Sequence, residues 1–129
     1  MGVRPLKLVP KGARMFRSLS FALALAALAG PAAAADGARV FQLQCRTCHA
    51  DASTPMAPTL KGVFGARIAG RADYKYSAAL AGKKGVWDAA ALDAFLTAPA
   101  KFAPGVRMPT GVARAEDRAA VIEHLKTLK

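Results

Sequence analysis

Apolar residues recur at helical spacing in several short stretches of the chain after residue 36. The first stretch runs from Gly37 to about Cys48, and Val40, Phe41 and Cys45 lie close to one stripe of that helix. The last runs from about Ala115 to Leu128, with acidic residues in its first turn and lysines in its last, which suits the helix dipole. The pattern therefore predicts helices at both ends of this part of the chain.

Capping residues predict two shorter helices between them. Ser77 can cap a helix that continues through Leu80 and ends at Gly82. Asp88 can cap another, which stops before Pro99 because the residue before a proline is biased away from helix. All the elements that the pattern predicts are therefore helices.

Two segments rich in proline and glycine separate these helices, residues 49–72 and residues 104–111. Such composition is typical of loops and not of a series of strands. Loops of this length without internal structure usually wrap around something or carry function. The chain is therefore expected to be all-α, with long loops around a site.

The first 35 residues are organised like a secretory signal peptide. Five basic residues and no acidic residue precede an apolar run from about Leu19 to Gly30. Small residues follow this run. The run is shorter than the ~20 residues that span a bilayer, so we expect a cleavable leader and no stable membrane span, with retention as an anchor as the alternative. Cleavage near Ala35 leaves residues 36–129 as one domain, and Met15 is an alternative start to Met1.

The pentad Cys45-Arg46-Thr47-Cys48-His49 is the attachment signature of a c-type haem. Its two thiols can add to the vinyl groups of one haem, and the next imidazole can then bind the iron. A thioredoxin-like pair, half of a zinc site and chance occurrence compete with this interpretation. The redox pair lacks the strands it needs, and the chain offers a zinc ion only His124 and no second pair of cysteines.

A haem iron bound by one histidine needs a second axial ligand or keeps an open site. The candidates after residue 36 are Met56, Met108 and His124. Met56 follows His49 by seven residues and is expected to stay on the same side of the haem, with core filler as its other role. His124 is expected to pack against the first helix. Met108 lies in a Pro-Gly loop that can aim its side chain inward, and it is the predicted ligand.

The charge of the chain is uneven. Fourteen of the 19 basic residues and all eight acidic ones lie at or beyond Asp36, so residues 36–129 carry +6. A basic surface suits nucleic acid, an anionic membrane or an acidic protein patch, and nucleic acid does not fit an exported protein. We expect acidic redox partners to dock on a basic face, with a merely solvated face as the alternative. The expected docking residues are Lys61, Lys75, Lys83, Lys84, Lys101 and Arg107.

These motifs resemble the class I c-type cytochromes, specifically the mitochondrial-like group of small soluble cytochromes c. The resemblance covers nearly all of residues 36–129, including residues 58–65 and 87–108. It implies the all-α cytochrome c fold, with three to five helices and long loops wrapped around one covalently bound haem c. It also implies export, in bacteria to the periplasm.

The resemblance assigns roles to individual positions. Cys45 and Cys48 would bind the haem covalently, while His49 and Met108 would be the axial iron ligands. Pro58 would hold His49 through its carbonyl group. Leu60 would pack on the haem, and the matches to positions that contact a propionate are Arg67, Tyr76 and Trp87.

Four further positions concern the crossing of the terminal helices and the surroundings of the methionine ligand. Gly37 matches a small residue that lets the terminal helices cross, and His124 replaces a common aromatic there. Phe95 stands where many relatives have a tyrosine near the methionine sulfur, and Val106 where many have a threonine. Because hydrogen bonds around a metal site tune it, these two changes predict a Met108–iron bond that is less supported than usual.

The function that the resemblance implies is electron transfer by a monomeric periplasmic protein whose iron cycles between Fe(III) and Fe(II). Six-coordinate iron has no open site for a substrate, so an enzyme is not expected. Three alternatives stay open: a haem subunit of a dehydrogenase or oxidase complex, a peroxidase-like or gas-binding haem protein with a labile Met108, and a thiol or zinc protein.

Overall fold

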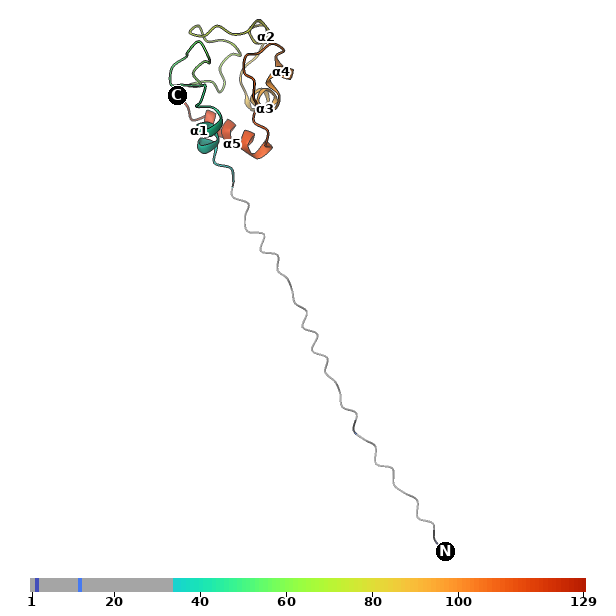
Figure 1. The fold of residues 1–129 in the computed structure, drawn as a ribbon. Coiled ribbons are helices and arrows are strands. Elements are labelled where there is room, and N and C mark those ends of the chain that lie inside the picture. Colours follow the sequence, from blue (N-terminus) through green and yellow to red (C-terminus); the bar gives the residue numbers. More distant parts are fainter. Residues whose placement is uncertain (1, 3–11, 13–33) are drawn as a thin grey trace. The chain divides into compact units, whose positions relative to one another are not determined.

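The structure is a computed structural model that describes Gly2, Gly12 and residues 34–129. The basic and apolar parts of the predicted leader lie outside the described residues. The described part holds five helices and no strand, apart from an isolated bridge between Arg67 and Val86 (Figure 1). The helices are α1 (Gly37–Gln44), α2 (Ala78–Ala81), α3 (Ala89–Thr97), α4 (Pro99–Phe102) and α5 (Ala115–Leu125). None of these helices is long and apolar enough to cross a membrane.

Side-chain caps set the starts of three helices. The Ser77 hydroxyl accepts the Leu80 N–H at 3.3 Å at the start of α2, and the Asp88 carboxylate accepts the Ala91 N–H at 2.8 Å at the start of α3. Both caps are confirmed as predicted. Asp36 does the same for α1, where its carboxylate accepts two backbone N–H groups. These caps satisfy donors that a helix cannot satisfy by itself.

The terminal helices are shorter than predicted. The first was expected to reach Cys48, but α1 ends at Gln44, and the Arg46 N–H donates back to the Phe41 carbonyl at 3.0 Å in a wider turn. The last was expected to reach Leu128, but α5 ends at Leu125. The Leu128 carbonyl instead accepts the Gly62 N–H at 3.0 Å. A local wide turn therefore ends α1, whereas a contact distant in sequence holds the chain after α5.

Helix α4 was not predicted, because Pro99 was interpreted only as a stop for the preceding helix. Proline also fits the first position of a new helix, where its missing N–H would have no partner anyway. Pro99 occupies this position, and the Phe102 N–H donates to the Ala98 carbonyl at 3.0 Å. One proline therefore both ends α3 and starts α4.

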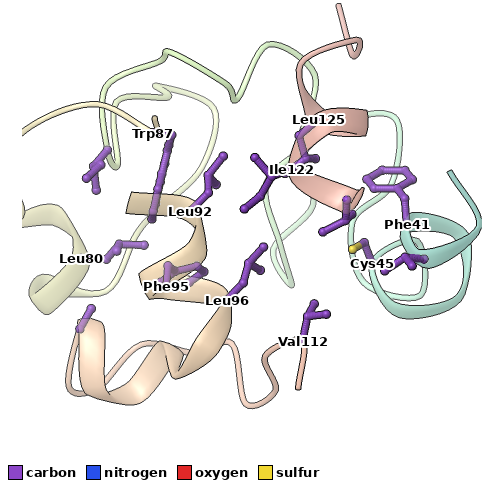
Figure 2. Packing of buried hydrophobic residues seen from close by; sticks show 14 residues of the cluster. Phe41, Cys45, Leu80, Trp87, Leu92, Phe95, Leu96, Val112, Ile122 and Leu125 are labelled. Atoms are coloured by element: carbon purple, nitrogen blue, oxygen red, sulfur yellow. The ribbon is translucent and has the colours of Figure 1, made fainter. Parts of the chain in front are cut away.

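The core forms where α5 lies between α1 and α3. Figure 2 shows Phe41 and Cys45 on the α1 side of α5, and Leu92 and Leu96 on the α3 side. Val121 of α5 is fully buried between them. The remaining buried apolar side chains of α3 and α5 are Phe95, Ile122 and Leu125.

Gly37 allows α1 and α5 to approach closely. A Cβ atom at Gly37 would lie 2.1 Å from the Ala120 carbonyl oxygen, a separation that no side chain tolerates. Beside this contact the rings of Phe41 and His124 pack with centroids 5.1 Å apart. Two expectations are confirmed: a small residue is needed at the crossing, and His124 packs against α1.

The substitution Gly37→Ala is expected to destabilise the haem-loaded protein by about 1–3 kcal/mol, because the added methyl group forces the two helices apart. Chemical denaturation measures this change. Gly82→Ala is the matched control, since Gly82 has a φ of −77° and an added Cβ would come no closer than 3.3 Å to the Ala78 carbonyl oxygen. Equal losses of stability in the two variants would contradict the close-approach explanation.

Candidate functional site

Both cysteines lie in the turn that follows α1. The N–H groups of Cys48 and His49 donate to the Cys45 carbonyl at 3.1 and 2.9 Å, and this turn buries Cys45 while Cys48 stays exposed. Burial raises the pKa of the Cys45 thiol to about 11. Redox-active pairs depend on a thiol whose pKa is lowered. The turn therefore does not favour the thioredoxin-like interpretation.

The His49 ring is held by the backbone of the following loop. Its Nδ1 lies 2.7 Å from the Pro58 carbonyl oxygen. A carbonyl can only accept, so Nδ1 carries the proton and Nε2 keeps its lone pair for a metal. Burial lowers the pKa of His49, and the bond to Pro58 acts in the opposite direction. A neutral imidazole of fixed tautomer, oriented by a backbone carbonyl, is typical of a metal ligand.

The loop that carries Pro58 is fixed by its own hydrogen bonds. Thr59 is buried, and its hydroxyl donates to the Asp51 carbonyl at 3.2 Å. The Thr59 N–H donates to the Ser53 hydroxyl at 3.0 Å. At the start of the loop, the Asp51 carboxylate pairs with Arg46 at 2.6 Å. The position of the Pro58 carbonyl, and through it that of His49, follows from this local network.

Met108 lies in the loop between α4 and α5, partly buried against the core. On one side of it the Val106 N–H donates to the Ala103 carbonyl at 2.9 Å, in a turn where Gly105 has a φ of +91°. On the other side the Val112 N–H donates to the Leu96 carbonyl at 2.7 Å. Bonds on both sides of Met108 thus limit the movement of its backbone.

Arg118 of α5 fastens the end of this loop. Its Nη1 donates to the carbonyls of Val112 and Ala113 at 3.0 and 2.9 Å, and its Nε donates to Asp93 of α3 at 2.9 Å. The side chain is only 13% exposed. One guanidinium group therefore connects α5, α3 and the Met108 loop.

The turn after α1, the Pro58 loop and the Met108 loop line one cavity of about 410 Å³. The structure brings together all nine residues singled out from the sequence. These are Cys45, Cys48, His49, Pro58, Leu60, Arg67, Tyr76, Trp87 and Met108. Most of the remaining lining is apolar, including Leu92, Leu96, Val121 and Leu125. Two thiols, an imidazole and a thioether on an apolar cavity fit a covalently held haem with two axial ligands.

Two of the three arginines that line the cavity, Arg67 and Arg71, differ in how they are held. Arg67 is exposed, and its backbone forms the bridge to Val86. Arg71 binds both carboxylate oxygens of Asp73 at 2.9 Å and donates to the Lys61 carbonyl at 3.3 Å. The Arg71 guanidinium holds the pKa of the Asp73 carboxyl group below its usual range. The family resemblance pointed only to Arg67, and Arg71 was not singled out from the sequence.

Trp87 belongs to a group of packed aromatic rings. Its ring centroid lies 5.1 Å from that of Phe95 and 5.7 Å from that of Phe102. Phe95 and Val106 both line the cavity, and neither side chain carries a hydroxyl group. Across the described residues, no hydrogen bond reaches the Met108 sulfur atom.

Two alternative roles from the sequence analysis find no support in the described residues. Met56 is 67% exposed and lines the cavity, so it does not pack in the core formed by the helices. The zinc interpretation finds no support, because the described residues contain no cluster of three His, Cys, Asp or Glu side chains that could hold a metal ion. His124, the only other histidine, packs on Phe41 and does not line the cavity.

Comparison with known proteins identifies the fold and the family. The family model described as Cytochrome c matches residues 34–129. The chain belongs to the cytochrome c family. Cytochrome cH from Methylobacterium extorquens has a similar structure, with a TM-score of 0.66 at 38% identity over 73% of this chain and 97% of that one. The predicted all-α cytochrome c fold is therefore confirmed.

Two cytochrome c sequences show how far the similarity extends. The cytochrome c homolog of Rickettsia felis is 42% identical over 97 residues, which is 72% of this chain and 55% of the relative. The chain thus spans about half the length of the rickettsial relatives it matches. Cytochrome c of Ulva intestinalis is 35% identical over 102 residues, covering 76% of this chain and 92% of the relative. Members of the family are electron carriers and not enzymes, and their cofactor is one covalently attached haem c.

The substitution Arg118→Met removes the guanidinium bonds of Arg118 and keeps most of its aliphatic bulk. Because two loop carbonyls lose a charged donor, we expect a loss of stability of about 1.5–3 kcal/mol in chemical denaturation of the haem-loaded protein. Asp93→Asn is the comparison. Asp93 is 53% exposed, and exposed ion pairs contribute about 1 kcal/mol or less. If Asp93→Asn cost as much as Arg118→Met, the carbonyl bonds would not be the main contribution.

Proposed function

We propose that this chain is an exported, monomeric one-haem electron carrier in which His49 and Met108 are the axial iron ligands. The observation that carries the proposal is the convergence of Cys45, Cys48, His49 and Met108 on one cavity. The free Nε2 of His49 supports it further, because the bond from Nδ1 to Pro58 leaves Nε2 available to a metal. When bound, the haem supplies a one-electron Fe(III)/Fe(II) couple.

The two cysteines fix the cofactor in place. Cys45 and Cys48 would each hold one vinyl group of the haem through a carbon–sulfur bond, and the thiol hydrogen would be transferred to the neighbouring vinyl carbon. The chain has no third cysteine to compete for either position. Cys45 and Cys48 lie in the same turn as His49, so covalent attachment also brings the imidazole to the iron.

The remaining cavity residues control the environment of the iron. Leu60, Leu92 and Val106 offer apolar surface that excludes water. Exclusion of water limits the solvent rearrangement that accompanies each electron transfer. A thioether paired with an imidazole raises the reduction potential relative to two imidazoles. The cavity is therefore suited to a carrier whose ligands stay the same in both oxidation states.

The sulfur ligand is expected to be displaceable. Phe95 and Val106 bring no hydroxyl to the cavity, and no donor among the described residues bonds to the sulfur of Met108. Around metal sites such outer hydrogen bonds commonly change affinity by about 10–100-fold. The Met108–iron bond therefore depends mainly on the backbone that carries it.

We further propose that acidic redox partners dock on basic side chains close to the cavity. Arg107 lines the cavity, and Lys101 lies in α4, six residues earlier. The Lys83 ammonium group, which follows α2, lies 4.9 Å from the centroid of the ring of Phe102, the last residue of α4. The net charge of +6 after residue 36 favours attraction of anionic partners. The leader supports export, in a bacterium to the periplasm, where the carrier would meet these partners.

The substitution Met108→Ala tests the sulfur ligand directly. The oxidised wild-type protein should show the weak sulfur-to-iron charge-transfer band on the near-infrared side of the visible spectrum, and Met108→Ala should lose it. Met56→Ala is the matched control, because Met56 also lines the cavity but is 67% exposed. Loss of the band in Met56→Ala, or its persistence in Met108→Ala, would contradict the assignment.

Salt dependence tests the basic docking face. The rate of reduction by anionic ferrocyanide should fall steeply as ionic strength rises, because salt screens the attraction to the lysines. Reduction by neutral hydroquinone at the same pH should change little. A ferrocyanide rate that is as insensitive to salt as the hydroquinone rate would rule out electrostatic steering at this surface.

A further inference from the structure

Tyr74 contacts both loops that carry the proposed iron ligands. The Tyr74 hydroxyl donates to the Met56 carbonyl at 3.3 Å, in the loop between His49 and Pro58. On the other side, the guanidinium carbon of Arg107 lies 5.4 Å from the centroid of the Tyr74 ring. One side chain thus connects the residue before Met108 to the loop that orients His49.

Arg107 makes a second contact with the same segment. Its Nη2 donates to the Lys75 carbonyl, next to Tyr74 in the chain. The guanidinium is therefore held by a ring and by the backbone of adjacent residues, and its aliphatic stem leads directly to Met108. A planar guanidinium can stack and donate at once, which a lysine ammonium cannot do in the same way.

Tyr74 itself is well supported. Its ring packs edge-on against Tyr76, with centroids 4.9 Å apart. Met56, Tyr74, Tyr76 and Arg107 all line the same cavity as the predicted ligands. A change in the orientation of Tyr74 would therefore alter the packing at the edge of the cavity beside Met108.

We propose that Tyr74 is a positioning residue that joins the Met108 loop to the His49 loop through Arg107 and Met56, and that it limits the displacement of Met108 from the iron. The proposal rests on His49/Met108 ligation as proposed above. It assigns to Tyr74 and Arg107 the support that Phe95 and Val106 do not supply. Displacement of Met108 requires its loop to move, and this movement would break the contacts of Arg107 with Tyr74 and Lys75.

Imidazole is the probe for this proposal, because it replaces a weakly held methionine on ferric haem. The haem-loaded protein is titrated with imidazole while the loss of the sulfur-to-iron charge-transfer band is followed. Tyr74→Leu and Arg107→Gln should each lower the apparent Kd for imidazole about tenfold, equivalent to about 1.4 kcal/mol. Tyr74→Phe keeps the ring and its contact with Arg107 but loses the bond to Met56, so a smaller decrease is expected.

Three comparisons separate positioning from charge and from general loss of stability. Arg114→Gln removes the same charge from an exposed residue that does not line the cavity, and it should leave the Kd unchanged. Arg107→Lys keeps the charge but should resemble Arg107→Gln. The effects of Tyr74→Leu and Arg107→Gln on the Kd should be less than multiplicative in the double variant, because both single variants remove the contact between Arg107 and Tyr74.

The outcomes also separate this proposal from the one on which it rests. Wild-type affinity for imidazole in both Tyr74→Leu and Arg107→Gln would overturn the role of Tyr74, even with Met108 as the ligand. A charge-transfer band that persists in Met108→Ala would instead overturn the ligand assignment. If Tyr74→Leu does not fold, Tyr74→Phe and Arg107→Gln decide the question, and unchanged affinity in both counts against the proposal.

Discussion

The apolar side chains of α3 and α5 face a common cavity as well as each other, and the fold depends on what fills that cavity. The helices are short, from four to eleven residues, and short helices gain most of their stability from packing. A cavity of about 410 Å³ in a chain of this size is far larger than the voids that protein interiors normally leave. A covalently held haem would supply the missing apolar mass, and we therefore expect folding and cofactor attachment to depend on each other.

Around this cavity the chain combines a firmly fixed side with a more weakly held one. His49 lies in the same turn as both cysteines, and its ring is oriented by the Pro58 carbonyl. Met108 is held through its backbone and through neighbours such as Arg107. No hydroxyl group among the described residues donates a hydrogen bond to its sulfur. The difference fits the ligation proposed above, in which the imidazole side is fixed and the methionine side can be displaced by an added ligand.

The sequence predicted those parts of the site and fold that local chemistry decides. The pentad, the Ser77 and Asp88 caps and the glycine at the α1–α5 crossing each depend on residues close in sequence or on a strong family pattern. The ends of α1 and α5 and the existence of α4 were missed or misplaced, because bonds such as Gly62 to Leu128 form only in the folded chain. Arg71, Arg118 and Tyr74 were also missed. The contact between Tyr74 and Arg107 joins residues 33 positions apart, and nothing in local composition marks such a pair.

The central claim is that Cys45 and Cys48 bind one haem covalently within the cavity. The most direct test is the intact mass of the protein after export from cells that attach haem, measured under denaturing conditions that release any haem not bound covalently. The account predicts a single species heavier than the polypeptide by one haem, with no thiol left to alkylate. A bare polypeptide with two reactive thiols would contradict it.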